Sequence, residues 1–428
     1  GSRMTDTTET PDASRPVGRQ NKTNSGSARA AFQNRAFRRI WVVSFASNIG
    51  TWIQNIVLPI YIYSRTGRAS LVALLIFAQL GPILLLSIPG GVLADRVNRK
   101  KFLVAMQSLQ LCSSLLLAAF TANDATIVLL FIAQLGVGIG NALQIPAWSA
   151  MLVSLVPPRD LGGAISLNST VINGARVIGP IVVLILSRFG VTAAEFFAIN
   201  AATYLFVIFA LISVPIADVA RDSTTGWRRF TFAFKIARER VVVSRLVLSL
   251  ASFSLLSLPY VGLFPAVAKL NFDIDPQGNA YKALYAIWGL GACIGGLSIS
   301  TLFVNVDNRK LIRIGFASFS ASMMAFAFAP TVALAFATAF FLGGAYFFTT
   351  TAMQTVFSAG LAPEIRGRVM ALWFMAFGGT VPIGNLVFGP MIDRYGSRWL
   401  LILGSLWAAV LWWWCDIERI ERQEETVL

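Results

Sequence analysis

The sequence contains no histidine, few charged residues and only three cysteines, and each shortage excludes a class of protein. Without histidine, the chain has no histidine metal ligands, no histidine general base and no histidine pH switch. Cys112, Cys293 and Cys415 lie far apart within apolar segments, which is typical of small buried hydrophobic residues and not of a disulfide framework. No Walker phosphate-binding loop is present, so direct use of ATP is unsupported. The sequence therefore predicts no enzyme, no metal site and no cofactor.

The low charge content indicates a membrane protein. Charged residues make up 13% of the chain, hydrophobic residues make up 56%, and the mean hydropathy is +0.68. A soluble globular chain has about 25% charged residues, so this one has too few for a surface that faces water. Apolar stretches of about 20 residues, the length of a membrane-spanning helix, recur along the chain. We predict an all-α fold with twelve spans: 40–63, 70–93, 101–120, 127–155, 162–186, 193–215, 242–268, 283–303, 311–329, 331–358, 367–391 and 397–415.

The positive charges predict the orientation in the membrane. Most of the 35 Lys and Arg residues fall in the segments that these spans place on one side of the membrane. By the positive-inside rule that side is the cytoplasm, and both termini lie there. The net charge of +15 then reflects topology. Its expected partner is anionic lipid and not nucleic acid.

Polar stretches divide the chain into five segments. A tag remnant and a disordered cytoplasmic tail (1–35) precede a six-helix bundle (36–215), a cytoplasmic linker (216–241), a second six-helix bundle (242–416) and a cytoplasmic tail (417–428). Trp227–Arg240 of the linker is either an amphipathic helix on the membrane surface or an unstructured connection. Asn98-Arg99-Lys100 recurs as Asn308-Arg309-Lys310, and a glycine and proline motif recurs at the same offset. The two halves therefore read as a duplicated unit.

The gap between the second and third spans carries the most informative motif. It combines a glycine, a carboxylate and three cations: Gly91, Asp95, Arg96, Arg99 and Lys100. This loop resembles the signature loop of the major facilitator superfamily. Asn98 stands where the family has a glycine, a change that asparagine tolerates because it also accepts a left-handed backbone. The resemblance implies a latch that holds one transport state; the alternative is a solvated run of charges that follows the positive-inside rule.

The resemblance covers residues 36–415 and extends to the superfamily branch that contains the enterobactin exporter and drug efflux proteins. Four stretches carry it: 58–67, 90–96, 175–180 and 366–372. It implies two pseudo-symmetric six-helix bundles that alternate access to a midplane site, in a monomer of the bacterial inner membrane. The implied activity is export of a siderophore or drug-like amphipathic small molecule by proton antiport. Uptake, lipid or lysolipid transport, and a non-transporting receptor-like protein remain alternatives.

Polar and aromatic residues within the spans are the candidate substrate contacts. Amides are concentrated in the first half and aromatic rings in the second. This distribution predicts a substrate cavity lined by amides on one side and by aromatic rings on the other. The candidates are Asn48, Trp52, Asn55, Gln134, Asn141, Asn173, Arg176, Tyr260, Trp288, Tyr346 and Trp373. Hydrogen bonds between helices are the alternative for each amide, and packing is the alternative for each ring. Arg176 is the one cation deep within a span and is either an anion-docking group or a structural arginine bonded to helix carbonyls, Asn173 or Glu195.

The fifth span carries Gly174, Gly179 and Pro180, which resemble the helix-packing motif of superfamily exporters. The small residues permit close helix packing, and the proline is expected to kink the helix. The glycine pair that usually follows the proline is absent. No carboxylate lies deep in a span, so the group that would couple transport to protons is not evident. Glu195 is the nearest candidate, and Asp95 is the second.

Overall fold

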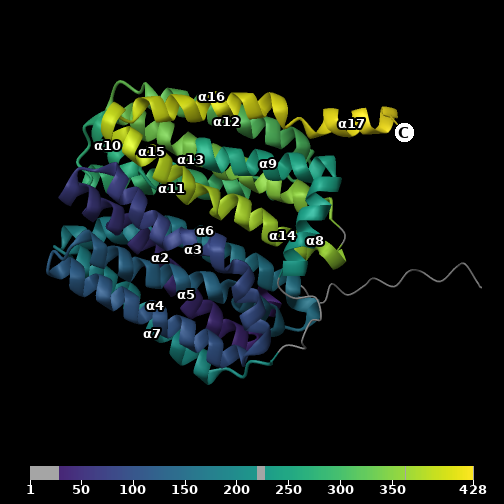
Figure 1. The fold of residues 1–428 in the computed structure, drawn as a ribbon, viewed down its shortest axis with the longest axis horizontal. Helices are drawn as coiled ribbons and strands as arrows, with labels where there is room; N and C mark the ends of the chain where they lie inside the picture. Colours follow the sequence, from purple (N-terminus) through teal and green to yellow (C-terminus); the bar gives the residue numbers. More distant parts are fainter. Residues whose placement is uncertain (1–27, 219–226, 362, 428) are drawn as a thin grey trace, which may run out of the picture.

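The computed structural model describes residues 28–218, 227–361 and 363–427, which form two helical bundles lying side by side (Figure 1). The first bundle contains α2 (Arg35–Thr66), α3 (Ala69–Arg96), α4 (Arg99–Ala122), α5 (Ile127–Ser154), α6 (Leu161–Arg188) and α7 (Ala193–Ser213). The second contains α9 (Val241–Leu256), α10 (Phe264–Phe272), α11 (Asn279–Ser298), α12 (Asn308–Ala327), α13 (Val332–Ala359), α14 (Pro363–Gly378), α15 (Thr380–Tyr395) and α16 (Arg398–Trp414). Among the described residues, eight helices are long and apolar enough to cross a membrane.

The two ends of the bundles differ in what they carry. At one end, called the terminal face here, lie the start of α2, the helix α8 (Trp227–Glu239) between the bundles, and α17 (Ile417–Val427) (Figure 1). At the other end, the opposite face, lie α10 and the short connections after α2, α4, α6 and α15. Of the two alternatives for the linker, its second part is helical: α8 packs against α9 and α14. Residues 219–226 lie outside the described part of the chain.

Part of the segment expected to be disordered is helical. Residues 28–33 form helix α1 (Ala28–Gln33), which packs against α6. The reason is apolar burial: Ala31 is fully buried, and the Phe32 ring meets Trp41 edge-on with ring centroids 5.3 Å apart. Residues 1–27, where the rest of that expectation falls, lie outside the described residues.

Two spans predicted to be continuous are broken, which corrects their predicted form. The seventh is divided into α9 and α10 by residues 257–263, where Pro259 has no N–H for a helical hydrogen bond. Ser257 instead ties this segment to α16 through a hydrogen bond from its hydroxyl to the carbonyl of Gly404 (2.9 Å). The eleventh is divided into α14 and α15 at Gly379. The eighth begins and ends earlier in the sequence than predicted, because α11 runs from Asn279 to Ser298.

Glycines bring α11 and α13 into backbone contact. A Cβ added to Gly291 would lie 2.0 Å from the carbonyl oxygen of Phe340, and one added to Gly343 would lie 2.2 Å from that of Trp288. Small residues at such a crossing let two membrane helices approach closely and gain van der Waals contact along their length. This crossing fixes the position of Trp288 and of the neighbouring Tyr346 and Phe347 in the second bundle.

Candidate functional site

The bundles contact each other along the halves of their helices that lie nearest the opposite face. Helix α3 lies along α15, α6 lies along α11, and α10 touches α2. At the outer end of the first pair, the Asp393 carboxylate of α15 accepts hydrogen bonds from the backbone N–H groups of Ala69 (2.6 Å) and Ser70 (3.1 Å) of α3. Deeper along the same pair, Gly379 lies against Leu84. The opposite face is therefore closed between the bundles in this conformation.

Arg176 lies at this boundary, near the middle of α6. Its side chain is buried, and Nη1 donates a hydrogen bond to Oδ1 of Asn173 (3.1 Å). The guanidinium carbon lies 3.5 Å from the centroid of the Phe347 ring in the second bundle and 5.7 Å from that of Trp52 in the first. The sequence suggested Asn173 and Glu195 as structural partners of Arg176. Among the described residues, its guanidinium bonds to Asn173 and makes no contact with Glu195.

The charge of Arg176 is incompletely compensated. Its Nε–H is buried and has no hydrogen-bond partner among the described residues. The titratable groups beside it are two tyrosines and a cysteine, Tyr285, Tyr346 and Cys293, which are neutral, and no described carboxylate is among them. A cation in a membrane interior is costly, by about 2.5–3.5 kcal/mol on insertion scales, unless it is paired. An arginine left with a free donor at the boundary of two bundles is suited to bind an anion.

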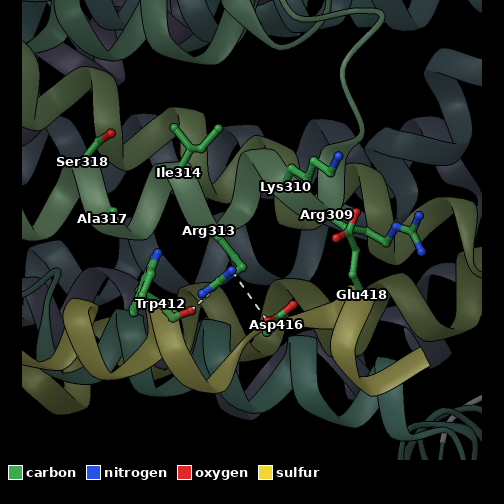
Figure 2. A pocket seen from close by; sticks show the side chains of 9 residues that line it. All are labelled: Arg309, Lys310, Arg313, Ile314, Ala317, Ser318, Trp412, Asp416 and Glu418. Atoms are coloured by element: carbon green, nitrogen blue, oxygen red, sulfur yellow. Dashed lines mark hydrogen bonds and ion pairs between the residues drawn. The ribbon is translucent and has the colours of Figure 1, made fainter. Parts of the chain in front are cut away.

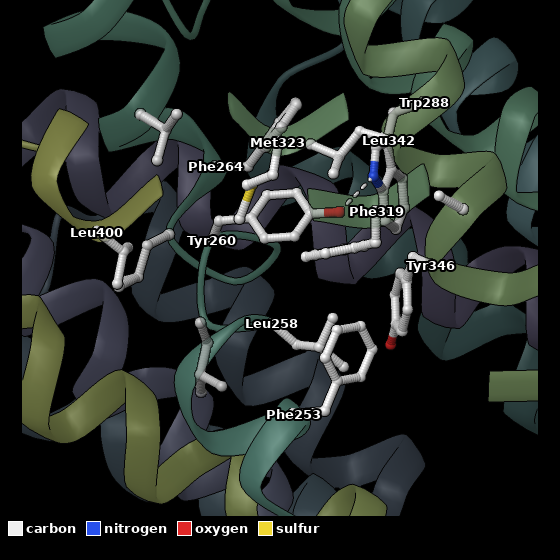
Figure 3. Close-up of a cluster of buried hydrophobic side chains, with 14 of the residues drawn as sticks. Phe253, Leu258, Tyr260, Phe264, Trp288, Phe319, Met323, Leu342, Tyr346 and Leu400 are labelled. Atoms are coloured by element: carbon white, nitrogen blue, oxygen red, sulfur yellow. Dashed lines mark hydrogen bonds between the residues drawn. The ribbon is translucent and has the colours of Figure 1, made fainter. Parts of the chain in front are cut away.

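Aromatic side chains from the second bundle cover the site on one side. Tyr260, Phe264, Tyr285, Trp288, Tyr346 and Phe347 form this group, called the aromatic cluster here, and all of them are buried except the partly buried Phe347. Figure 3 shows Tyr260, Phe264, Trp288 and Tyr346 from this cluster. The indole N–H of Trp288 donates to the Tyr260 hydroxyl (3.0 Å). Tyr260 lies in the break between α9 and α10. The interruption of the seventh span therefore places the Tyr260 hydroxyl within reach of Trp288.

We expect Tyr260→Phe to lower the free energy of unfolding by about 1–3 kcal/mol, because it leaves the buried Trp288 N–H without an acceptor. Thermal unfolding of the purified variant measures this loss. Tyr281→Phe is the matched control, since Tyr281 is also buried in this region and the structure describes no hydrogen bond of its hydroxyl. Equal melting temperatures for the two variants would contradict the assignment.

The amides of the first half mostly bond to each other within the first bundle. Gln54 donates to Oε1 of Gln134 (2.9 Å) and accepts from Nδ2 of Asn200 (2.6 Å), and all three are buried. Asn55 accepts a hydrogen bond from Nε2 of Gln79 (2.7 Å). These contacts link α2 to α3, α5 and α7. The amides therefore form hydrogen bonds between helices, which was the alternative to substrate contact.

The other candidate contacts are scattered. Asn48 donates to the Ser44 carbonyl of its own helix (2.8 Å), and Asn141 is partly exposed on α5. Trp373 is buried against Phe357, with ring centroids 4.8 Å apart. Of the ten residues that were candidates beside Arg176, Trp52 and Asn173 contact it, and Tyr260, Trp288 and Tyr346 belong to the aromatic cluster.

The glycine and proline motif of α6 packs this helix against α2. A Cβ at Gly179 would lie 2.7 Å from the Cβ of Trp52, and one at Gly174 would lie 3.2 Å from the Phe45 ring. Pro180 is buried and remains within the helix. Close packing here sets how near Trp52 comes to Arg176.

The signature loop binds the last turn of α7 and the segment that follows this helix. Arg99 is buried, and its backbone N–H donates to Asp218 (3.1 Å), while Lys100 donates to the Ile212 carbonyl (3.4 Å). Asn98 does not have the left-handed backbone that the sequence led us to expect. With φ −59° it caps α4, where its side chain accepts a hydrogen bond from the Lys101 N–H.

The other motif residues make no comparable contact among the described residues. Gly91 has open space around it and Arg96 is exposed, whereas the side chain of Asp95 lies outside the described part of the chain. The sequence did not reveal Asp218, because one carboxylate in a polar linker has no distinguishing feature.

The repeat of this loop in the second half is held by the C-terminal helix. Asp307 caps α12, and Arg309 bonds to both Asp307 and Glu421 of α17. The hydrogen bonds from Arg309 lower the pKa of Asp307 to about 2, so this pair remains charged far below neutral pH. Beside it, Arg313 donates to the Trp412 carbonyl (3.2 Å) and lies 3.7 Å from Asp416, in a groove of about 350 Å³ between α12 and α16 (Figure 2).

Glu195, the candidate for proton coupling, lies in the first turn of α7 at the opposite face. It is exposed, and its N–H donates to the capping hydroxyl of Thr192 (3.4 Å). A carboxylate in this position is stabilised by the N-terminal end of the helix dipole. Its role in coupling stays a prediction.

Comparison with known proteins identifies relatives along almost the whole chain. Residues 26–425 match the family described as transmembrane secretion effector. Macrolide efflux protein A of Streptococcus pyogenes is 24% identical over 86% of this chain and 93% of its own length. The enterobactin exporter EntS of Escherichia coli is 23% identical, covering 88% and 92%. A Na(+), Li(+), K(+)/H(+) antiporter of Planococcus maritimus is 26% identical, covering 87% and 93%.

Solved structures share the fold. A mutant of the nucleoside transporter NupG superposes with a TM-score of 0.74 over 89% of this chain and 99% of its own, at 14% identity. A bacterial homologue of the iron transporter ferroportin, in an inward-facing state, gives a TM-score of 0.69 with the same coverage and identity. At such identities the likeness concerns the fold alone, and it is the two-bundle fold of twelve membrane spans that the sequence predicted.

Proposed function

The chain belongs to the major facilitator superfamily, within the transmembrane secretion effector family, and from this premise we propose that it exports a siderophore or a drug-like amphipathic molecule. Membership makes it a multi-pass membrane transporter of small molecules and not an enzyme. What we propose beyond family membership is the direction of transport and the class of substrate. We place the protein in a bacterial inner membrane as a monomer, with both termini cytoplasmic.

The observation that carries the substrate proposal is the state of Arg176. It is a buried cation at the boundary of the bundles, with an unpartnered Nε–H and no described carboxylate beside it. Hydrogen bonds in which one partner is ionised are shorter and about twice as strong as neutral ones. Siderophores with catecholate or carboxylate groups are anionic, so they would supply the missing partner.

The aromatic cluster supports a ligand that contains rings. Its faces offer apolar area and stacking, while Arg176 and Asn173 offer polar contacts at one edge, a combination typical of ligand sites. Relatives named for macrolide efflux and for enterobactin export support a large amphipathic ligand. A cationic drug is the less favoured alternative, because the described site contains a cation and no carboxylate.

We further propose that transport alternates between two states and exchanges substrate for protons. The closed opposite face is one state, and the loop of Gly91, Asp95, Arg96, Arg99 and Lys100 would latch the terminal face in the other. The relative named as a cation/proton antiporter supports exchange. Glu195 and Asp95 stay the candidate proton-binding groups.

Transport by purified protein in liposomes tests this proposal. With an acidic lumen, protons leaving the liposome should drive entry of a labelled catecholate siderophore by exchange, and a protonophore should abolish the accumulation. Accumulation with an acidic exterior instead would indicate uptake by symport. A protein that moves neither siderophore, macrolide nor lysolipid under either gradient would be a receptor-like member of the fold, and the proposal would fail.

A further inference from the structure

The closed opposite face is held by a carboxylate that crosses from one bundle to the other. Asp393 lies three residues before the C-cap of α15, and its two oxygens accept from the N–H groups of Ala69 and Ser70, at 2.6 and 3.1 Å. These are the first two residues of α3, and the side chain of the N-cap residue Arg68 makes no capping hydrogen bond. The second bundle therefore supplies the cap that α3 lacks in its own sequence.

Close packing of α15 on α3 positions this carboxylate. One turn before Asp393, a Cβ added to Gly389 would lie 2.9 Å from the Cβ of Ala73 and 3.1 Å from the Cα of Ser70. The two helices thus approach at backbone distance at this point. A short aspartate side chain reaches the helix end only because of that approach, so its hydrogen bonds require the two helices to be in contact.

The other described side-chain caps differ from this one in a decisive way. Each belongs to the residue that directly precedes its helix, and so it is kept whatever the bundles do: Asn34, Asn98, Thr192, Asp307 and Thr331. The Asp393 cap joins two bodies that must separate at this face if access alternates. Its stabilisation therefore favours one transport state over the other.

We propose that Asp393 is a positioning residue of the transport cycle, a latch that keeps the opposite face closed by capping α3 across the bundle boundary. This rests on the proposed alternation of access but on no particular substrate. Removing a side-chain N-cap weakens a helix end by an amount equivalent to a roughly 2- to 30-fold change in an equilibrium. Loss of Asp393 should increase the population open at the opposite face by a similar factor.

Labelling of a single cysteine measures that population without any substrate. Ile76→Cys, in a chain with Cys112, Cys293 and Cys415 replaced by serine, places a thiol about 10 Å along α3 from Ala69, where Ile76 faces Gly262 of the other bundle and is 9% exposed. Asp393→Ala should raise its rate of labelling by a water-soluble maleimide about 2- to 30-fold. Asp393→Asn, which keeps an acceptor oxygen, should give a smaller increase.

Two further variants make the test specific. Ala69→Pro removes one donor while leaving the carboxylate, and proline suits the first helical position because Arg68 before it is extended; it should also raise labelling. Asp273→Asn is the control: it removes a charge from the same face, where Asp273 pairs with Lys269 of its own bundle, and labelling should not change. Unchanged labelling in the Asp393 variants and in Ala69→Pro would overturn the latch, even if transport of a siderophore is demonstrated. If Asp393→Ala does not fold, Asp393→Asn and Ala69→Pro decide the question.

Discussion

Replacing Arg176 by alanine should weaken binding of anionic ligands about 10- to 150-fold while the protein still folds. A hydrogen bond to a charged group contributes about 1.5–3 kcal/mol, which corresponds to that range in dissociation constant. The measurement is a thermal-shift titration with a panel of anionic siderophores and cationic dyes. For the native chain, a ligand at 100 times its dissociation constant stabilises the folded state by about 2.7 kcal/mol.

Folding should survive this substitution because two effects on stability oppose each other. Alanine removes the hydrogen bond to Asn173 and the stacking of the guanidinium on Phe347, which is worth about 2 kcal/mol when such a contact is desolvated. It also removes an incompletely paired cation from the membrane interior, whose presence costs about 2.5–3.5 kcal/mol on insertion scales. The net change in stability is then small compared with the loss in binding.

Arg245→Ala is the matched control. Arg245 also stacks on an aromatic ring, 4.1 Å from the centroid of Trp414, and donates to a carbonyl, but it does so at the end of the second bundle near the terminal face. It should leave anion binding intact. Arg176→Lys, which keeps a charge without the planar fork of donors, should bind anions with intermediate affinity. Anion binding that survives Arg176→Ala would place the site elsewhere, and cation binding that survives it would favour multidrug efflux.

The spans could be predicted from the sequence because each requires a long apolar run, and their ends fell within a few residues of the observed helices. The breaks could not. Pro59, Pro146 and Pro180 all remain inside continuous helices, whereas the segment around Pro259 leaves the helix. Neighbouring helices can satisfy the backbone groups that a proline frees, so the outcome depends on tertiary contacts such as that of Ser257 with Gly404.

The candidate site was predictable only in part, for a similar reason. Arg176 stood out because a cation within a span is rare. The amides carried no comparable signal, since Gln54, Gln134 and Asn200 look alike in sequence whether they line a cavity or bond to each other across helices. Asp393 was missed because its role depends on where α3 of the other bundle begins, which no local pattern records.

Gly291→Ala should lower the free energy of unfolding by about 1–3 kcal/mol, and Gly291→Leu should yield no folded protein. The added Cβ would lie 2.0 Å from the carbonyl oxygen and 2.8 Å from the carbonyl carbon of Phe340. Backbone atoms cannot rotate away as a side chain does, so α11 and α13 must separate, and forcing extra atoms into a packed core costs about this much. Thermal unfolding and size-exclusion chromatography of the two variants measure the effect.

Gly296→Ala, one and a half turns further along α11, isolates the cause. The nearest atom to a Cβ there is the Thr351 hydroxyl at 3.6 Å, an ordinary contact. Alanine is also favoured over glycine within a helix by about 0.8–1 kcal/mol, so this variant should be at least as stable as the native chain. Because α11 carries Trp288 and α13 carries Tyr346 and Phe347, Gly291→Ala should also weaken ligand binding by moving the aromatic cluster relative to Arg176. Equal stability of the two variants would show that the helices are not held at backbone contact, and the position assigned to the cluster would lose its basis.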